Sequence, residues 1–158
     1  ILTAAYEVEQ RLWIVTPYFV PDDGLMRALR LQARLGRDVR LVLPTKSNHL
    51  FPDIARGKFV RELRAAGARV YGYSGPMMHA KHLVFDDRIA VVGSINFDMR
   101  SLYLNFEAAL FIYTAPEVHE TARWMSELMD QCTDLEAVEA GPVRRLAEDV
   151  TMLVSPLL

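Results

Sequence analysis

The residues of this chain whose types and spacing are suited to chemistry begin with His79 and Lys81 and continue with Ser94 and Asn96. Lysine supplies a positive charge, and serine and asparagine supply neutral hydrogen-bond donors, a combination that suits the oxygens of a phosphoryl group. Histidine, with an ordinary pKa of about 6.5, attacks phosphorus when neutral or protonates a leaving alkoxide when charged. These four side chains are therefore suited to phosphoryl transfer without a metal.

A β-hairpin is predicted to bring the four side chains together. Two short apolar runs, residues 83–85 and 89–92, flank the polar pair Asp87-Arg88, the pattern of two strands joined by a tight turn. With that pair as the turn, the four side chains share one face of the hairpin, Lys81 opposite Ser94 and His79 opposite Asn96. Asp86 falls on the other face, so we expect it to brace the backbone rather than meet a substrate.

The spacing of these residues resembles the HKD motif of the phospholipase D superfamily. The matching pattern is His79-x-Lys81-x4-Asp86-x6-Gly93-Ser94-x-Asn96. More narrowly, the run VVGSINFDMRSLYLNFE, with its Arg100-Ser101 and Asn105-x-Glu107 pairs, is similar to the bacterial cardiolipin synthase branch.

The resemblance implies a role for each matching residue. His79 is implied to be a covalent nucleophile or a general acid, Lys81 and Asn96 to contact the phosphate, and Glu107 to orient the imidazole. A carboxylate within an apolar strand is costly unless it has a partner, which is a physical reason to pair Glu107 with His79. Supporting roles pass by resemblance to Asp86, Gly93, Ser94, Arg100 and Asn105.

The same resemblance implies phosphatidyl transfer through a phosphohistidine, in which two phosphatidylglycerols form cardiolipin and glycerol. Active sites of this family use two such motifs and this chain contains one, so residues 1–158 are expected to be a single domain, the C-terminal half of a two-motif enzyme. The family places the nucleophile more often in the first motif, which makes His79 the expected general acid and base. The expected partners are phosphatidylglycerol, a membrane surface, and an N-terminal half or a second copy of the chain.

Two alternatives remain open at this point. A phosphodiesterase or nuclease could assemble two copies of the motif in a symmetric homodimer. An isolated half-domain could also fold and pair without any turnover of its own.

Composition narrows the class of protein. The hydrophobic share of 51% indicates a globular domain, and the net charge of -2 does not favour a nucleic-acid partner. Cys132 is the only cysteine, which excludes an intrachain disulfide and a cysteine-based zinc site. No cofactor is expected, and strand alternation separates His79 from His82 and Asp86, which argues against a metal site.

The sequence bears on membrane association in two ways. No apolar run approaches the roughly 20 residues that a transmembrane helix needs, so the chain itself is expected to be soluble. By resemblance, the full-length protein is expected at the bacterial inner membrane. A run of basic residues in the predicted helix 53–66 indicates a solvated helix face or, alternatively, contact with anionic lipid: Arg56, Lys58, Arg61 and Arg64.

The order of apolar segments predicts an α/β/α sandwich with a mixed, largely parallel sheet. Strands alternate with helices through the first half of the chain, which predicts parallel strands joined by crossovers. The hairpin and a later strand extend this sheet, and two further helices follow. The expected strands cover residues 12–16, 39–43, 68–73 and 106–113, and the expected helices cover residues 3–10, 24–35, 53–66, 117–132 and 143–153.

Two loops are expected beside the site because they follow the first two parallel strands. Ligands meet open α/β sheets at the carboxyl ends of such strands. Tyr18 and Phe19 follow the first strand and could line an acyl or glycerol pocket or pack in the core. Lys46 and His49 follow the second and could contact a head group or serve only as loop residues.

Overall fold

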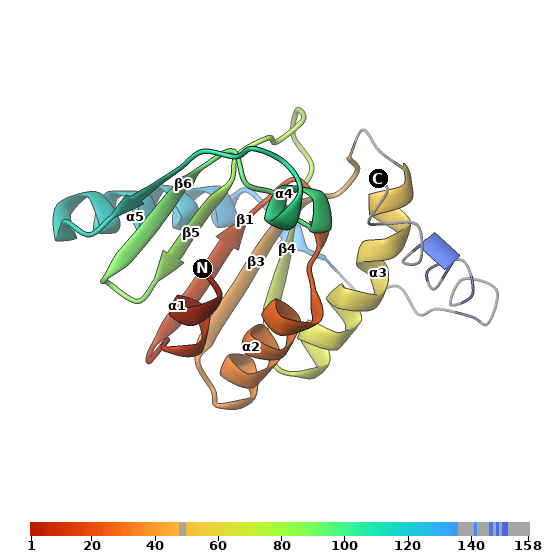
Figure 1. Ribbon diagram of the computed structural model, residues 1–158, viewed down its shortest axis with the longest axis horizontal. Coiled ribbons are helices and arrows are strands. Elements are labelled where there is room, and N and C mark those ends of the chain that lie inside the picture. Colours follow the sequence, from red (N-terminus) through yellow and green to blue (C-terminus); the bar gives the residue numbers. More distant parts are fainter. Residues whose placement is uncertain (48–49, 136–140, 142–145, 147, 149, 152–158) are drawn as a thin grey trace.

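The computed structural model of the protein describes residues 1–47, 50–135, 141, 146, 148, 150 and 151. Within these residues, a seven-stranded sheet has the strand order β8-β6-β5-β1-β3-β4-β9 (Figure 1). Its strands are β1 (Arg11–Val15), β3 (Asp38–Pro44), β4 (Arg69–Tyr73), β5 (His82–Phe85), β6 (Ile89–Gly93), β8 (Ala109–Ile112) and β9 (Thr133–Asp134).

The centre of the sheet is parallel, as the alternation of strands and helices predicts. β1 pairs with β3 and β3 with β4 in parallel, whereas β5, β6, β8 and β9 join through antiparallel pairs. The expected mixed sheet is confirmed, with a smaller parallel part than expected. A separate two-stranded sheet joins β2 (Phe19–Val20) to β7 (Phe97–Asp98).

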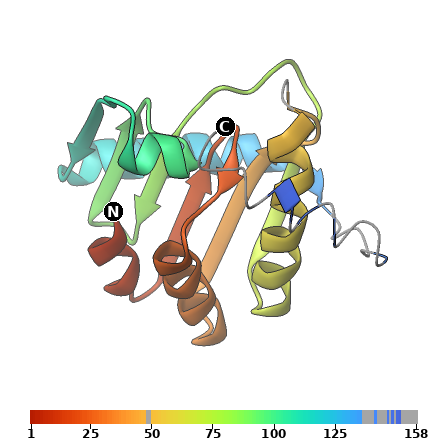
Figure 2. The ribbon, with the colours of Figure 1, turned by 45° about the vertical axis from the view of Figure 1, so that its right-hand side comes forward.

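Helices cover both faces of the sheet, which confirms the α/β/α sandwich. Figures 1 and 2 show α1 (Leu2–Tyr6), α2 (Asp23–Arg34) and α3 (Leu50–Ala65) on one face and the long helix α5 (Ala115–Asp130) across the other. The short helix α4 (Met99–Tyr103) follows β7.

Strand alternation divides the core into two layers. Ile14 of β1 and Leu41 of β3 face α2 and α3, whereas Trp13 and Val42 face α5. Asp22 caps α2 by accepting a hydrogen bond from the Leu25 N–H at 2.7 Å.

The hairpin register differs from the predicted one by a single residue. Phe85 pairs with Ile89, so the turn contains three residues and Lys81 lies opposite Gly93 rather than Ser94. The reason is Asp86, which adopts a left-handed φ of 53°, a conformation that aspartate tolerates better than most residues. The sequence pattern could not distinguish a two-residue turn from this one.

One other expectation was wrong in detail. The strand predicted over residues 106–113 forms only over Ala109–Ile112, so Glu107 precedes it. The predicted helix 143–153 lies mostly outside the described residues.

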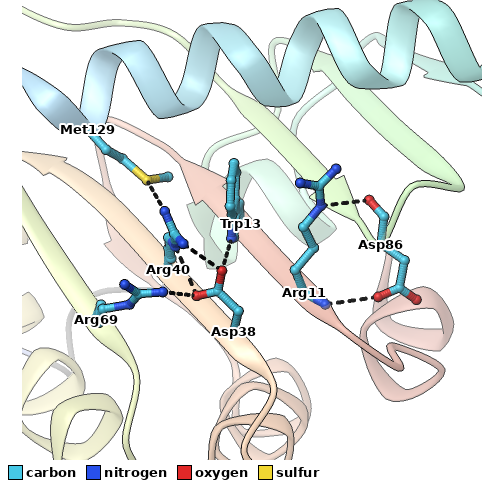
Figure 3. Close-up of polar contacts among 7 residues, drawn as sticks. All are labelled: Arg11, Trp13, Asp38, Arg40, Arg69, Asp86 and Met129. Atoms are coloured by element: carbon cyan, nitrogen blue, oxygen red, sulfur yellow. Dashed lines mark hydrogen bonds and ion pairs between the residues drawn. The ribbon is translucent and has the colours of Figure 1, made fainter.

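A polar cluster ties the sheet together at the end where the parallel strands begin. Asp38 accepts hydrogen bonds from Trp13 Nε1 at 3.0 Å and Arg40 Nε at 2.9 Å, and it also pairs with Arg69 (Figure 3). The Arg40 guanidinium stacks over the Trp13 ring, 4.3 Å from its centroid. Partial burial opposes ionisation of Asp38, but these donors outweigh it and hold its pKa below the ordinary value.

Candidate active site

The predicted phosphoryl site lies at the opposite end of the sheet, where the parallel strands finish. The last residue of β1, Val15, pairs with His82, the first residue of β5. His79 and Lys81 therefore enter β5 beside the carboxyl ends of β1 and β3, as an open α/β sheet requires of a ligand site.

His79 and Lys81 contact one another directly. Nζ of Lys81 lies 2.9 Å from Nδ1 and 3.0 Å from Nε2 of His79, and it donates to the His79 carbonyl oxygen at 2.8 Å. His79 is exposed, whereas Lys81 is buried. Desolvation and, to a smaller extent, the Lys81 charge lower the pKa of His79, so the imidazole is mostly neutral at pH 7.

The Lys81 ammonium interacts with two carboxylates across the site. Burial lowers the pKa of Lys81, while the charges of Glu107 and Asp98 oppose that effect. Lys81 therefore joins the histidine side of the site to the side that carries Glu107.

Glu107 is held by hydroxyl and amide groups rather than by the imidazole. The Ser94 hydroxyl donates to Glu107 Oε2, and Asn105 Nδ2 donates to Oε1 at 3.4 Å. The Ser94 bond, followed by bonds from Ser101 and Asn105 and by the Lys81 charge, holds the pKa of Glu107 below its ordinary value. The expected pairing of Glu107 with His79 is not among the described bonds.

Ser94 forms its hydrogen bonds with neighbouring residues of the site, and these bonds hold the site together. Its N–H donates to the Ala108 carbonyl at 2.9 Å, and its Oγ accepts from the Ala108 N–H at 3.0 Å. With the bond to Glu107, these contacts engage the hydroxyl as both donor and acceptor. The register shift does not scatter the site, because Ser94 and Asn96 lie beyond the end of β6, where strand alternation no longer applies.

Ser101, which the motif pattern includes only as the neighbour of Arg100 and without a role of its own, lies within the site. It is buried, it accepts a hydrogen bond from Asn96 Nδ2 at 3.2 Å, and it bonds Glu107. Its N–H donates to the Asp98 carboxylate at 2.7 Å, which caps α4. The signal was its position three residues after Asp98, the spacing of a helix cap.

Gly93 is required by the close approach of β8. A Cβ at this position meets the Ala108 carbonyl oxygen at 2.3 Å and the Ala109 Cα at 2.7 Å. Both are backbone atoms, so any side chain here pushes β8 away from β6. The glycine of the motif thus permits the contact that brings Glu107 to the site.

Asp86 braces the backbone, as expected. Its carboxylate accepts from the N–H groups of Glu9, Gln10 and Arg11, the last two at 2.8 and 2.9 Å. Arg11 Nε also donates to the Asp86 carbonyl at 3.1 Å (Figure 3). Burial raises the pKa of Asp86, but the backbone donors outweigh it and leave the pKa below the ordinary value.

The loop residues that were expected beside the site differ in how far they are buried. Phe19 is fully buried and packs against Phe97 and Phe59, with ring centroids 6.3 and 6.2 Å away. Its proposed place in a substrate pocket is therefore wrong, and it instead anchors β2 to β7, beside Asn96.

Tyr18 is half-buried and Lys46 is exposed, both at the site end of the sheet, whereas His49 lies outside the described residues. Arg100 is exposed on α4. The part of these residues in substrate binding stays a prediction.

The basic residues of α3 are engaged within the chain. Arg56 donates to the Pro44 and Thr45 carbonyls at 2.6 and 2.7 Å, Arg61 pairs with Glu148, and Arg64 pairs with Asp134. These bonds favour a structural role for the arginines over a lipid-binding helix face.

The described part of the chain lacks the side-chain groupings of a metal site and the helices of a membrane span. It holds no group of three or more histidine, cysteine, aspartate or glutamate side chains placed to bind a metal ion. None of its helices combines the length and the apolar character needed to cross a bilayer.

Comparison with solved structures identifies the fold of the chain. Nuc from Salmonella typhimurium, described as a phospholipase D family member, superposes with a TM-score of 0.74 at 21% identity, over 85% of this chain and 88% of that chain. A phosphatidylserine synthase from Haemophilus influenzae superposes with a TM-score of 0.77 at 17% identity, over 99% of this chain and 44% of that one. The fold is that of phospholipase D.

Sequence comparison identifies the family to which the chain belongs. Residues 1–129 match the family described as "Cardiolipin synthase, PLD-like domain". The chain is 36% identical over its whole length to cardiolipin synthase 1 of Bacillus anthracis, and 39% identical over 95% of its length to a cardiolipin synthase of Clostridium perfringens. It belongs to the family of cardiolipin synthase phospholipase D-like domains, and it spans about a third of the length of the curated relatives it matches.

Proposed function

We propose that the chain is the C-terminal half of a two-motif phosphatidyltransferase that condenses two phosphatidylglycerols to cardiolipin and glycerol. The observation that carries this proposal is the match to cardiolipin synthases over the whole chain, at 36% identity for the Bacillus anthracis protein. The His79, Lys81 and Asn96 arrangement supplies half of a phosphoryl-transfer site, and the shorter length of the chain relative to those proteins leaves room for another half.

In the proposed reaction, a histidine of the other motif attacks the phosphorus of the first phosphatidylglycerol. A nitrogen–phosphorus bond forms, the bond to the glycerol oxygen breaks, and protonated His79 donates its proton to that oxygen, which leaves as glycerol. A hydroxyl of the second phosphatidylglycerol then gives its proton to neutral His79 while its oxygen attacks phosphorus. The nitrogen–phosphorus bond breaks and cardiolipin is released.

The geometry supports these roles for the residues of this chain. The lowered pKa of His79 favours the neutral form that takes a proton in the second step. Lys81 brings a buried positive charge within hydrogen-bond distance of His79, where it offsets the charge of a phosphate oxygen. Glu107, through its interaction with Lys81, helps keep that lysine charged.

The test supplies phosphatidylglycerol to the protein encoded by the complete reading frame and follows cardiolipin and glycerol. Both products are expected in equal amounts, and both are expected to be lost in the His79→Ala variant. Formation of cardiolipin at an unchanged rate by that variant contradicts the assignment of His79.

A homodimeric phosphodiesterase is the second candidate, and one observation favours it. The chain covers 88% of the Nuc chain, so a domain of this size stands as a chain of its own elsewhere in the phospholipase D family. Hydrolysis of a phosphodiester by residues 1–158 alone, lost in His79→Ala and without a lipid product, decides for this candidate.

A further inference from the structure

The segment between β4 and β5, residues 74–81, crosses the edge of the sheet that carries the site. In the strand order, β3 and β1 lie between β4 and β5, and the parallel strands β1, β3 and β4 all end at this edge. Figure 2 shows this crossing segment passing over the ends of β1 and β3. Its exposed side chains therefore lie at the edge where a ligand meets an open α/β sheet.

Packing contacts fix the course of the crossing segment. At its start, a Cβ added to Gly75 would overlap the Tyr73 ring, so this ring lies against the Gly75 backbone. Further along, Met78 is 7% exposed and packs in the core layer on the α5 side, which Tyr73 and Ala80 also contact. The segment is therefore fixed on both sides of Met77.

Met77 is an apolar side chain that this packing leaves open. It is 43% exposed, whereas Met78 is buried and His79 is exposed again. This alternation is typical of an extended chain, in which residues two positions apart point to the same side and lie roughly 7 Å apart. Met77 and His79 therefore share one side of the crossing segment.

The surroundings of His79 differ in polarity along the chain. The polar groups of the site interact with Lys81, which follows His79 and contacts it, and they include the charged Glu107 and Asp98. Carboxylates provide acceptors for the hydroxyl groups of a substrate. Met77, which precedes His79, carries a thioether that is only a weak acceptor and is suited to contact with hydrocarbon.

Phe106, the exposed apolar neighbour of Glu107, points away from these polar groups. The side chains of Asn105 and Glu107 bond each other at 3.4 Å, so they lie on one side of the chain. Phe106, between them, lies on the other side. Met77, in contrast, shares a side with His79.

We infer that Met77 contacts the acyl arm of the phosphatidylglycerol whose phosphorus lies at His79, and that this contact sets a preference among acyl chains. The inference rests on the proposed function, which supplies the substrate. Phosphatidylglycerol carries a glycerol arm with free hydroxyls and an apolar diacylglyceryl arm on either side of its phosphorus. With the glycerol arm toward Lys81 and Glu107, and the diacylglyceryl arm over Met77, each arm meets groups of matching polarity.

Methionine oxidation tests the contact without any need for turnover. The protein encoded by the complete reading frame is treated with hydrogen peroxide, and mass spectrometry follows sulfoxide formation at Met77. Dihexanoyl phosphatidylglycerol, at about ten times its dissociation constant, is expected to slow this oxidation by about tenfold. Met26, which is buried under α2, should resist oxidation throughout and reports that the protein stays folded.

A head-group analogue identifies the arm that covers Met77. Glycerophosphoglycerol has the phosphate and both glycerols but no acyl chains. At a concentration that competes with the lipid for the site, it is expected to leave Met77 as reactive as in the free protein. Equal protection by glycerophosphoglycerol assigns Met77 to the polar part of the substrate and overturns the inference.

Substitutions measure the preference among acyl chains. Met77→Ser is expected to lower kcat/KM for dihexanoyl phosphatidylglycerol by about fivefold, mainly through KM, and to change that for the dibutanoyl lipid much less. Met77→Leu, which keeps an apolar side chain of similar size, should retain the preference. Leu31→Ser is the control, because Leu31 is 45% exposed on α2, away from the crossing segment. Equal losses with both lipids in Met77→Ser contradict a contact with the acyl chains.

Other outcomes separate this inference from the proposed function. Resistance of Met77 to peroxide before lipid is added shows that protein covers it, which overturns the inference. Protection by dihexanoyl phosphatidylglycerol without any cardiolipin formation supports the contact and contradicts the proposed function. Cardiolipin formation with Met77 unprotected supports the proposed function and overturns the contact.

Discussion

The two ends of the β5–β6 hairpin carry residues of one motif, yet they are built differently. At the turn end, Asp86 is buried and accepts hydrogen bonds from three consecutive backbone N–H groups. At the open end, His79 is exposed and its described side-chain contact is with Lys81. The motif thus combines an anchor, whose bonding capacity is used within the fold, with a histidine whose side chain is left accessible.

This comparison predicts that substitutions at the open end reduce turnover while those at the turn end reduce stability. Substitutions at four positions test the separation, beginning with the largest expected effect.

His79→Ala in the protein encoded by the complete reading frame is expected to lower kcat by about 10²- to 10⁴-fold, the usual contribution of a general acid–base group. The free energy of unfolding should stay unchanged because His79 is exposed. Urea denaturation and steady-state kinetics measure the two quantities. His119→Ala is the control, since His119 is an exposed histidine on α5, and a comparable loss of kcat there contradicts the assignment.

Asp86→Ala is expected to lower the free energy of unfolding by about 2–4 kcal/mol, because it leaves three backbone donors without their carboxylate. Asp87→Ala, at an adjacent exposed position, should cost less than about 1 kcal/mol. Urea denaturation at pH 7 compares them, and equal losses contradict the anchor role of Asp86.

The pH dependence of stability sharpens the same contrast. The folded-state pKa of Asp86 lies below its value in the unfolded chain, so its contribution is present above about pH 4 and is lost as the pH falls through the folded pKa. The loss of stability on acidification should therefore be smaller in Asp86→Asn than in the unsubstituted protein. Asparagine keeps the tolerance for positive φ, so a change in backbone strain does not explain the result.

Gly93→Ala is expected to affect both stability and turnover, because Gly93 lies in β6, which runs between the two ends of the hairpin. The added Cβ meets backbone atoms of Ala108 and Ala109, so β8 must move, at a cost of about 1–3 kcal/mol. Turnover should fall as well, since the movement displaces Glu107. Gly36→Ala is the control for stability. Nothing lies within 4 Å of an added Cβ at Gly36, so any loss of stability there comes from its positive φ of 78° and not from a clash. Full activity in Gly93→Ala contradicts the close approach of β8.

Ser101→Ala is expected to have the smallest effect, a decrease in kcat of about fivefold from the loss of a hydrogen bond worth roughly 1 kcal/mol. Removal of this bond raises the pKa of Glu107 toward its ordinary value, so the acid limb of the pH–rate profile should move to higher pH. A merely structural role leaves that limb in place. Ser74→Ala, in an exposed loop, is the control.

Local patterns predicted the parts of this protein that depend on neighbours in sequence. The alternation of strands and helices predicted the parallel centre of the sheet, and the motif spacing selected His79, Lys81 and Asn96 as candidate site residues. Parity within the hairpin assigned Asp86 to the backbone. Each of these depends on residue type and on separations of a few positions, which the chain carries wherever it folds.

Contacts between segments far apart in the sequence determined the features that local patterns did not predict. The turn length depends on Asp86, which accepts hydrogen bonds from N–H groups some 75 residues away. The burial of Phe19 depends on its packing against Phe97. Glu107 pairs with Ser94 rather than His79 because Gly93 lets β8 approach β6. The sequence by itself determined which groups could do the chemistry, whereas the packing of strands and loops determined which of them hold the site and which remain free to react.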